Sequence, residues 1–216
     1  MANKYPTVTT PRGVLVYPHI TKPDTKFVKP DGEYHTKFAL VAGKYTTDAF
    51  IAQLQEVLDA HIEENPEGLK PAALKKTTRA EFAEEELDEE GEETGRVVFK
   101  FKLKAKVKTE TKEWEQAPRL FDGKAEPING DIHPWTGTEA KVSLELFPYF
   151  MQSTKTFGLS LRMKAVQILS LVEGSGKSGD SYGFGEEEGG FVDESTGRAS
   201  GFGDESSDDD DGDEEF

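Results

Sequence analysis

An alternation of apolar and charged residues marks the segment from Arg96 to Lys108. Odd-numbered positions from 97 to 107 are apolar, and even-numbered positions from 100 to 108 are lysines. A period of two places the two sets on opposite faces of a β-strand. The pattern therefore predicts a strand with one face on a core and a row of ammonium groups on the other. The row consists of Lys100, Lys102, Lys104, Lys106 and Lys108.

Four more segments, at 12–21, 33–41, 140–150 and 157–171, have the residue types and patterning of strands. After the second of them, apolar residues recur at helical spacing from Phe50 to Ile62. A threonine at 46 or 47 can cap this helix, and Pro66 ends it. The order predicts a mainly β fold: an antiparallel barrel of five or six strands, similar to the OB type, with one helix between strands 2 and 3.

Acidic residues are concentrated in two segments. Residues 173–216 hold 16 Asp/Glu and 2 Lys/Arg, which accounts for −14 of the chain's net charge of −16. Residues 81–93 hold 9 acidic residues and no basic ones, and the rest of the chain has 24 Lys/Arg against 17 Asp/Glu. We expect one domain over 1–172, which is basic outside an acidic loop insertion at 81–93, and a disordered Gly-rich and acidic tail over 173–216.

The tail ends in an aromatic residue. An apolar ring at the end of a solvated tail has no core to join. Phe216 therefore either binds a pocket on a partner protein or is the incidental last residue of a solubilising segment. An acidic tail can also compete with a polyanion for the basic body. The tail residues predicted to bind partner proteins are Asp208, Asp209, Asp210, Asp211, Asp213, Glu214, Glu215 and Phe216.

Catalytic and metal-binding patterns are missing from the sequence. The absence of cysteine excludes disulfides and thiolate metal sites. The four histidines, at 19, 35, 61 and 133, have no metal-ligand spacing, so we expect neither a metal site nor a cofactor, and no enzymatic activity. With neither a signal peptide nor a long apolar run, we expect a soluble, cytoplasmic protein without a membrane partner.

Cations beside aromatic rings are typical of proteins that bind single-stranded nucleic acid, because the cations follow the phosphates and the rings stack on bases. Stacking needs only a π face, so we expect little sequence preference and no separation of DNA from RNA. The lysine row can instead be a solvated outer face, and each ring can instead belong to the core. The candidates are Tyr17, Trp114, Trp135, Phe147 and Tyr149, with Lys22, Lys100, Lys102, Lys104, Lys106, Arg162 and Lys164.

Four short segments, in order along the chain, are similar to one family. They are YPHITKPD at 17–24, VFKFK at 98–102, FPY at 147–149 and DEEF at 213–216. Together they resemble the single-stranded DNA-binding proteins of bacteriophages, the type with a proline-rich first strand region, an OB core and an acidic tail ending in Phe. The chain departs from that type in its 81–93 insertion and its Gly/Phe-rich linker.

The resemblance implies binding of single strands during phage DNA replication and recombination in the host cell cytoplasm. It makes Tyr149 the first stacking candidate and assigns phosphate contacts to Lys100 and Lys102. It also implies that the tail contacts the phage DNA polymerase and helicase-primase, and it leaves a homodimer open. Two other functions remain possible interpretations of the sequence. The second candidate is an acidic interaction protein, such as a DNA mimic or a chaperone for basic partners, and the third is a metal nuclease.

Overall fold

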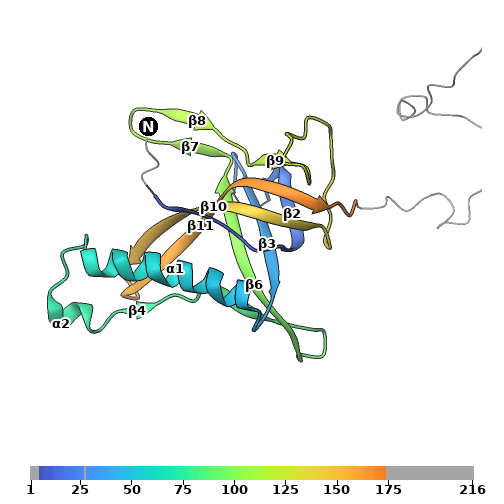
Figure 1. Ribbon diagram of the computed structural model, residues 1–216. Coiled ribbons are helices and arrows are strands. Elements are labelled where there is room, and N and C mark those ends of the chain that lie inside the picture. Colours follow the sequence, from blue (N-terminus) through green and yellow to red (C-terminus); the bar gives the residue numbers. More distant parts are fainter. Residues whose placement is uncertain (1–4, 27, 174–216) are drawn as a thin grey trace, which may run out of the picture. The chain divides into compact units, whose positions relative to one another are not determined.

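The computed structural model of the protein describes residues 5–26 and 28–173 (Figure 1). Five long strands pair in the order β10-β2-β3-β6-β11, and β11 also pairs with β10, which closes the ring. All of these pairs are antiparallel except β6 with β11, which is parallel. The mainly β, OB-like barrel is therefore confirmed. Its strands are β2 (Gly13–Asp24), β3 (Glu33–Val41), β6 (Glu93–Lys104), β10 (Glu139–Met151) and β11 (Thr156–Ser170).

The core fills the inside of this ring with side chains that alternate along the strands. Phe38, Phe99, Phe101 and Met163 are fully buried there. Gly13, at the pairing of β2 with β10, lies so close to Phe38 that a Cβ would come within 2.6 Å of that ring. The barrel can close at this point because glycine has no side chain.

The predicted helix is α1 (Tyr45–Glu64), and it lies between β3 and β6 as expected. Its apolar face includes Phe50, whose ring meets that of Phe99 edge-on at 5.2 Å, and the helix contacts β10 and β11 (Figure 1). The capping expectation was wrong. Lys44 occupies the N-cap position, and the Thr47 hydroxyl donates to the carbonyl of Val41 at 2.8 Å.

Short elements add to this ring of five strands. Among the described residues, the main sheet has nine strands, and β7 and β8 form a separate two-stranded sheet. The additions are β1 (Thr7–Thr9), α2 (Pro71–Leu74), β4 (Thr78–Arg79), β5 (Ala83–Leu87), β7 (Lys106–Lys108), β8 (Glu113–Glu115) and β9 (Arg119–Phe121).

The acidic segment at 81–93 was expected to be a loop, and the structure corrects this. Its strand β5 pairs antiparallel with β6, with Ala83 opposite Phe99 and Glu84 opposite Val98. The outer edge of β6 has backbone groups that need partners, and the backbone of β5 supplies them in spite of the charge on its side chains. The acidic segment is therefore an edge hairpin of the barrel.

One further expectation about strands changes. The lysine-bearing strand was expected to run to Lys108, but it ends at Lys104, because the backbone N–H of Ala105 donates to the carbonyl of Gly32 and the chain continues as the β7–β8 hairpin. The FPY segment at 147–149 lies inside β10, within the strand expected at 140–150, with Pro148 opposite Leu159 of β11. The predicted tail lies outside the described residues from 174 onward. Among the described residues, no helix is long and apolar enough to cross a membrane.

Candidate nucleic-acid interface

Cations from three strands meet on the outer face of the barrel. Lys37 of β3 lies directly opposite Lys100 of β6, and Lys102 of β6 is a register partner of both His35 and Arg162. Like charges placed opposite each other across strands destabilise a sheet. An anionic ligand that binds on this exposed face would neutralise the Lys37–Lys100 pair.

Two carboxylates from neighbouring strands partly offset this charge. Glu84 Oε1 of β5 lies 2.6 Å from Lys100 Nζ, and Glu33 Oε1 lies 3.8 Å from Lys102 Nζ. The hydrogen bond from Lys100 and its charge hold the pKa of Glu84 below its usual range. Exposed ion pairs of this kind contribute little net stability, about 0–1 kcal/mol. Phosphate groups can therefore replace these carboxylates at low cost.

Tyr17, which lies beside these cations, has an unusual backbone conformation. β2 has one residue more than β3 between Val16 and His19, and Tyr17 within this bulge has φ 50°. Its backbone N–H donates to Thr136 Oγ1 at 3.0 Å, and the side chain is 69% exposed. A bulky residue with positive φ is uncommon and strained, and such strain is found at functional sites. The structure thus presents this ring to solvent at a conformational cost.

Two shallow cavities flank the lysines. One, of about 310 Å³, is lined by Tyr17, His35 and Lys37 together with Lys100 and Lys102. The second, of about 550 Å³, is lined by Lys100 and Lys102 again, with Phe82 and Glu84 of the acidic hairpin and Tyr149 of β10. Because both cavities share the same two lysines, they form one surface, and the rings of Tyr17 and Tyr149 line it.

Tyr149 is half-buried, and the hydroxyl end of its ring lies close to Gly158 on β11. A Cβ at Gly158 would lie 2.5 Å from Cζ and from the hydroxyl oxygen of the tyrosine. The absence of a side chain at Gly158 leaves room for this ring, which also lines the larger cavity. A ring that lines the cavity beside the lysines suits stacking on a base.

Phe147 and Phe150 are packed differently from Tyr149. The guanidinium of Arg162 lies 3.7 Å from the centroid of the Phe147 ring, and the ring of Tyr5 lies 4.6 Å away. The Phe150 ring packs on Phe157 at 4.6 Å. We interpret Phe147 as a support that holds Arg162 beside Lys102 by a cation–π contact.

The other candidates lie apart from this surface. Lys106 pairs with Glu113 across the β7–β8 hairpin, where Glu113 raises the lysine's pKa, and Trp114 is 44% exposed on the same hairpin. Lys164 lies 3.9 Å from Glu145. Trp135 is 60% exposed in the loop before β10, next to Thr136, whose hydroxyl accepts the hydrogen bond from the backbone N–H of Tyr17. Lys22 and Lys104 are exposed on β2 and β6 but line neither cavity.

Sequence reasoning missed four residues of the surface: Glu33, His35, Lys37 and Glu84. The alternation in 33–41 could have placed the first three on one outer face. Glu84 had no such signal, because its neighbour Lys100 is 16 residues away and is reached only through the pairing of β5 with β6. The spacing of the histidines in the sequence also gave no sign that His19 and His35 lie opposite each other on β2 and β3.

Solved structures of phage proteins share this fold. The crystal structure of gp2.5, a single-stranded DNA-binding protein encoded by bacteriophage T7, matches with a TM-score of 0.60 and 21% identity over 82% of this chain and 98% of that chain. A C-terminal truncation of the single-stranded DNA-binding protein from bacteriophage Enc34 matches with a TM-score of 0.51, 11% identity, and 77% and 87% coverage.

The Enc34 protein in complex with single-stranded DNA matches with a TM-score of 0.52, 13% identity, and 79% and 89% coverage. No protein-family model matches the chain, and no curated protein matches it in sequence. At these identities the likeness establishes the fold that the chain shares with these proteins.

Proposed function

We propose that this protein binds single-stranded DNA on the outer face of its barrel, largely without sequence preference. The observation that carries the proposal is the cross-strand pair Lys37–Lys100, next to Lys102, between the rings of Tyr17 and Tyr149. Three structures of the same fold belong to proteins named as single-stranded DNA-binding, one of them in complex with single-stranded DNA, which supports the choice of ligand.

Binding follows from the geometry of the strands. Alternate lysines on one strand face are about 7 Å apart, close to the phosphate spacing of an extended single strand. Phosphates take the place of Glu84 and Glu33 on Lys100 and Lys102, while bases stack on Tyr17 and Tyr149. Neither contact reads a base edge, so the affinity depends on salt far more than on sequence.

The biological role that we propose is protection of single strands during phage DNA replication, recombination and repair, in the host cell cytoplasm. The tail's net charge of −14 supports a competition between the tail and DNA for the basic surface. A tail displaced by DNA then contacts the phage DNA polymerase and helicase-primase through its acidic residues and Phe216. A homodimer is compatible with this role.

The deciding experiment is a titration of fluorescent oligo-dT with the full chain at several salt concentrations. Changing both Lys100 and Lys102 to Ala should weaken binding and reduce the slope of log affinity against log salt by about 1.4, since each phosphate contact to a single strand contributes about 0.7. The matched control is Lys75→Ala with Lys76→Ala, two exposed lysines after α2, with the same change in net charge.

Equal losses for the two pairs would show that net charge alone is at work and would contradict the proposed surface. A full chain that does not bind oligo-dT at any salt concentration would favour the acidic interaction protein.

A further inference from the structure

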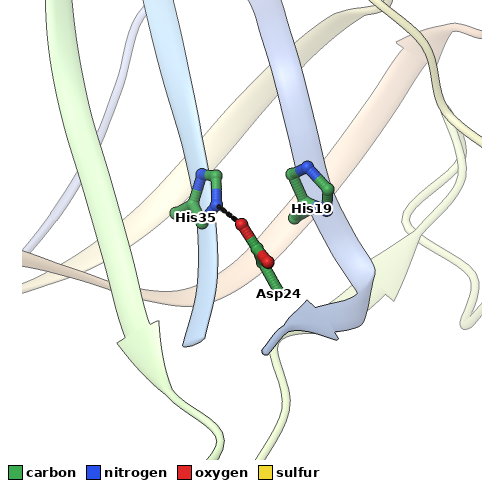
Figure 2. Close-up of side chains that lie close together, drawn as sticks. All are labelled: His19, Asp24 and His35. Atoms are coloured by element: carbon green, nitrogen blue, oxygen red, sulfur yellow. Dashed lines mark hydrogen bonds and ion pairs between the residues drawn. The ribbon is translucent and has the colours of Figure 1, made fainter. Parts of the chain in front are cut away.

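Two histidines and an aspartate converge on one side of the β2–β3 pair (Figure 2). His19 and His35 are register partners with ring centroids 4.7 Å apart. The Oδ2 atom of Asp24 lies 3.2 Å from Nε2 of His35. One potential ligand atom from each residue lies within 4.8 Å of the other two. Three potential metal-ligand atoms thus lie close together, although their residues are up to 16 positions apart in the sequence.

An irregularity in β2 creates this convergence. From the pair His19–His35 to the pair Asp24–Glu33, β2 advances five residues while β3 advances two. A regular ladder would keep Asp24 farther along and away from the histidines. The three extra residues return it to them, and the backbone N–H of Lys26 donates to its Oδ1 at 2.7 Å. That hydrogen bond holds one carboxylate oxygen and leaves Oδ2 directed toward His35.

The donor set fits a transition metal better than a hard cation. Two imidazole nitrogens with one carboxylate oxygen are a recurring ligand set for Zn²⁺ that leaves a coordination position open. Ligand atoms on one tetrahedral Zn²⁺ are separated by about 3.3–3.5 Å, given bonds of about 2.0–2.1 Å. Asp24 and His35 already have nearly this separation, and His19 is an exposed side chain that can close the remaining distance by a rotamer change.

The charges around the cluster are compatible with a cation. Lys102, which pairs in register with His35, already has Glu33 3.8 Å from its ammonium group. An Asp–His ion pair alone explains the contact between Asp24 and His35, but it does not explain a second imidazole at the same point.

We propose that His19, Asp24 and His35 bind a divalent transition-metal ion, with Zn²⁺ as the best fit, and leave at least one coordination position open. The proposal goes beyond the proposed DNA binding and does not depend on it. His35 also lines the cavity that contains Tyr17 and Lys102, so the ion lies beside the proposed DNA surface.

The test uses the full chain and the metal alone. Zn²⁺ is titrated against a chromogenic chelator, and Co²⁺ is titrated with detection of its visible bands, which are strong at low coordination number. We expect one equivalent of Zn²⁺ and a low-coordinate Co²⁺ spectrum. His19→Gln, His35→Gln and Asp24→Asn should each weaken Zn²⁺ binding at least about tenfold, since even outer-shell changes at metal sites cost about 10–100-fold.

The matched control is His133→Gln. His133 Nε2 lies 3.7 Å from Asp131 Oδ2, so this change removes a similar His–Asp pair and should leave Zn²⁺ binding unchanged. Ions held by the acidic tail should show the weak spectrum of six-coordinate Co²⁺ and respond to none of the histidine changes.

His19 is exposed, so His19→Gln should fold, and its thermal unfolding midpoint without metal reports this directly. A folded His19→Gln protein with unchanged Zn²⁺ affinity and an unchanged Co²⁺ spectrum overturns the proposal. Since the assay contains no DNA, it can fail while the DNA-binding proposal stands, and the reverse also holds.

Discussion

At the scale of single residues, Tyr17 and Tyr149 offer their rings in opposite ways. Tyr17 is mostly exposed on a strained backbone, whereas Tyr149 is half-buried with its ring against Gly158. Losing the first ring should therefore affect binding alone, and losing the second should affect binding and packing together. Paired substitutions separate the two effects.

Two substitutions of Tyr17 can be compared. Tyr17→Ala and Tyr17→Gly both remove the ring and should each weaken oligo-dT binding by about 1–3 kcal/mol. The glycine variant should be more stable than the alanine variant by about 1 kcal/mol, because glycine adopts φ near 50° without a Cβ penalty. Urea denaturation and oligonucleotide titration measure the two quantities. Full DNA affinity in both variants would remove Tyr17 from the interface.

Tyr149→Ala should also lose about 1–3 kcal/mol of binding free energy if the ring stacks on a base. Gly158→Ala is its partner experiment, since the added Cβ forces the Tyr149 ring to move. We expect weaker binding in both variants, with a lower thermal unfolding midpoint for Gly158→Ala. Unchanged affinity in a stably folded Tyr149→Ala protein would reassign this ring to packing.

At the scale of elements, the contact between Glu84 of β5 and Lys100 of β6 predicts that the acidic hairpin competes with DNA for the proposed surface. Glu84→Gln should raise oligo-dT affinity roughly two- to fivefold, in line with an exposed ion pair worth up to about 1 kcal/mol. Glu56→Gln on the exposed side of α1 has the same charge change and should leave the affinity closer to that of the parent. An equal rise in both variants would mean that overall charge is responsible, and not the contact between Glu84 and Lys100.

The same contact has a pH dependence with a defined sign. Lys100 lowers the pKa of Glu84 in the folded protein, so the stability from this pair is present above the unfolded-state pKa and is lost as pH falls through the folded-state pKa. Protonation of Glu84 also releases Lys100. We therefore expect the gain in affinity of Glu84→Gln over the parent to shrink in acid, and titrations at neutral and acidic pH measure this.

At the scale of the whole molecule, charge is divided between a nearly neutral body and an acidic tail. Ending the chain after Glu173 removes almost all of the tail's negative charge and should tighten oligo-dT binding, most strongly at low salt, where electrostatic competition is least screened. A titration of both chain lengths over a range of salt measures this. Equal affinities at low salt would reject the competition between tail and DNA.

Local periodicity was sufficient to predict the main secondary-structure elements of the barrel. The five ring strands and α1 follow from periods of two and 3.6 in the apolar positions, which depend only on neighbouring residues. The common outward face of Lys100 and Lys102 follows in the same way. A strand's pattern therefore shows which side chains point outward, together with the charge that they carry.

The partners of those side chains depended on register and bulges, which no local period encodes. Glu84 reaches Lys100 only because β5 pairs with β6, and Tyr17 turns outward only at a bulge. His19, Asp24 and His35 meet because β2 has extra residues opposite β3. These contacts join residues from different strands, and closing the barrel sets which strands are adjacent. The sequence thus predicted which kinds of side chain lie on the surface. Which of these side chains contact each other depended on the strand pairing in the closed barrel.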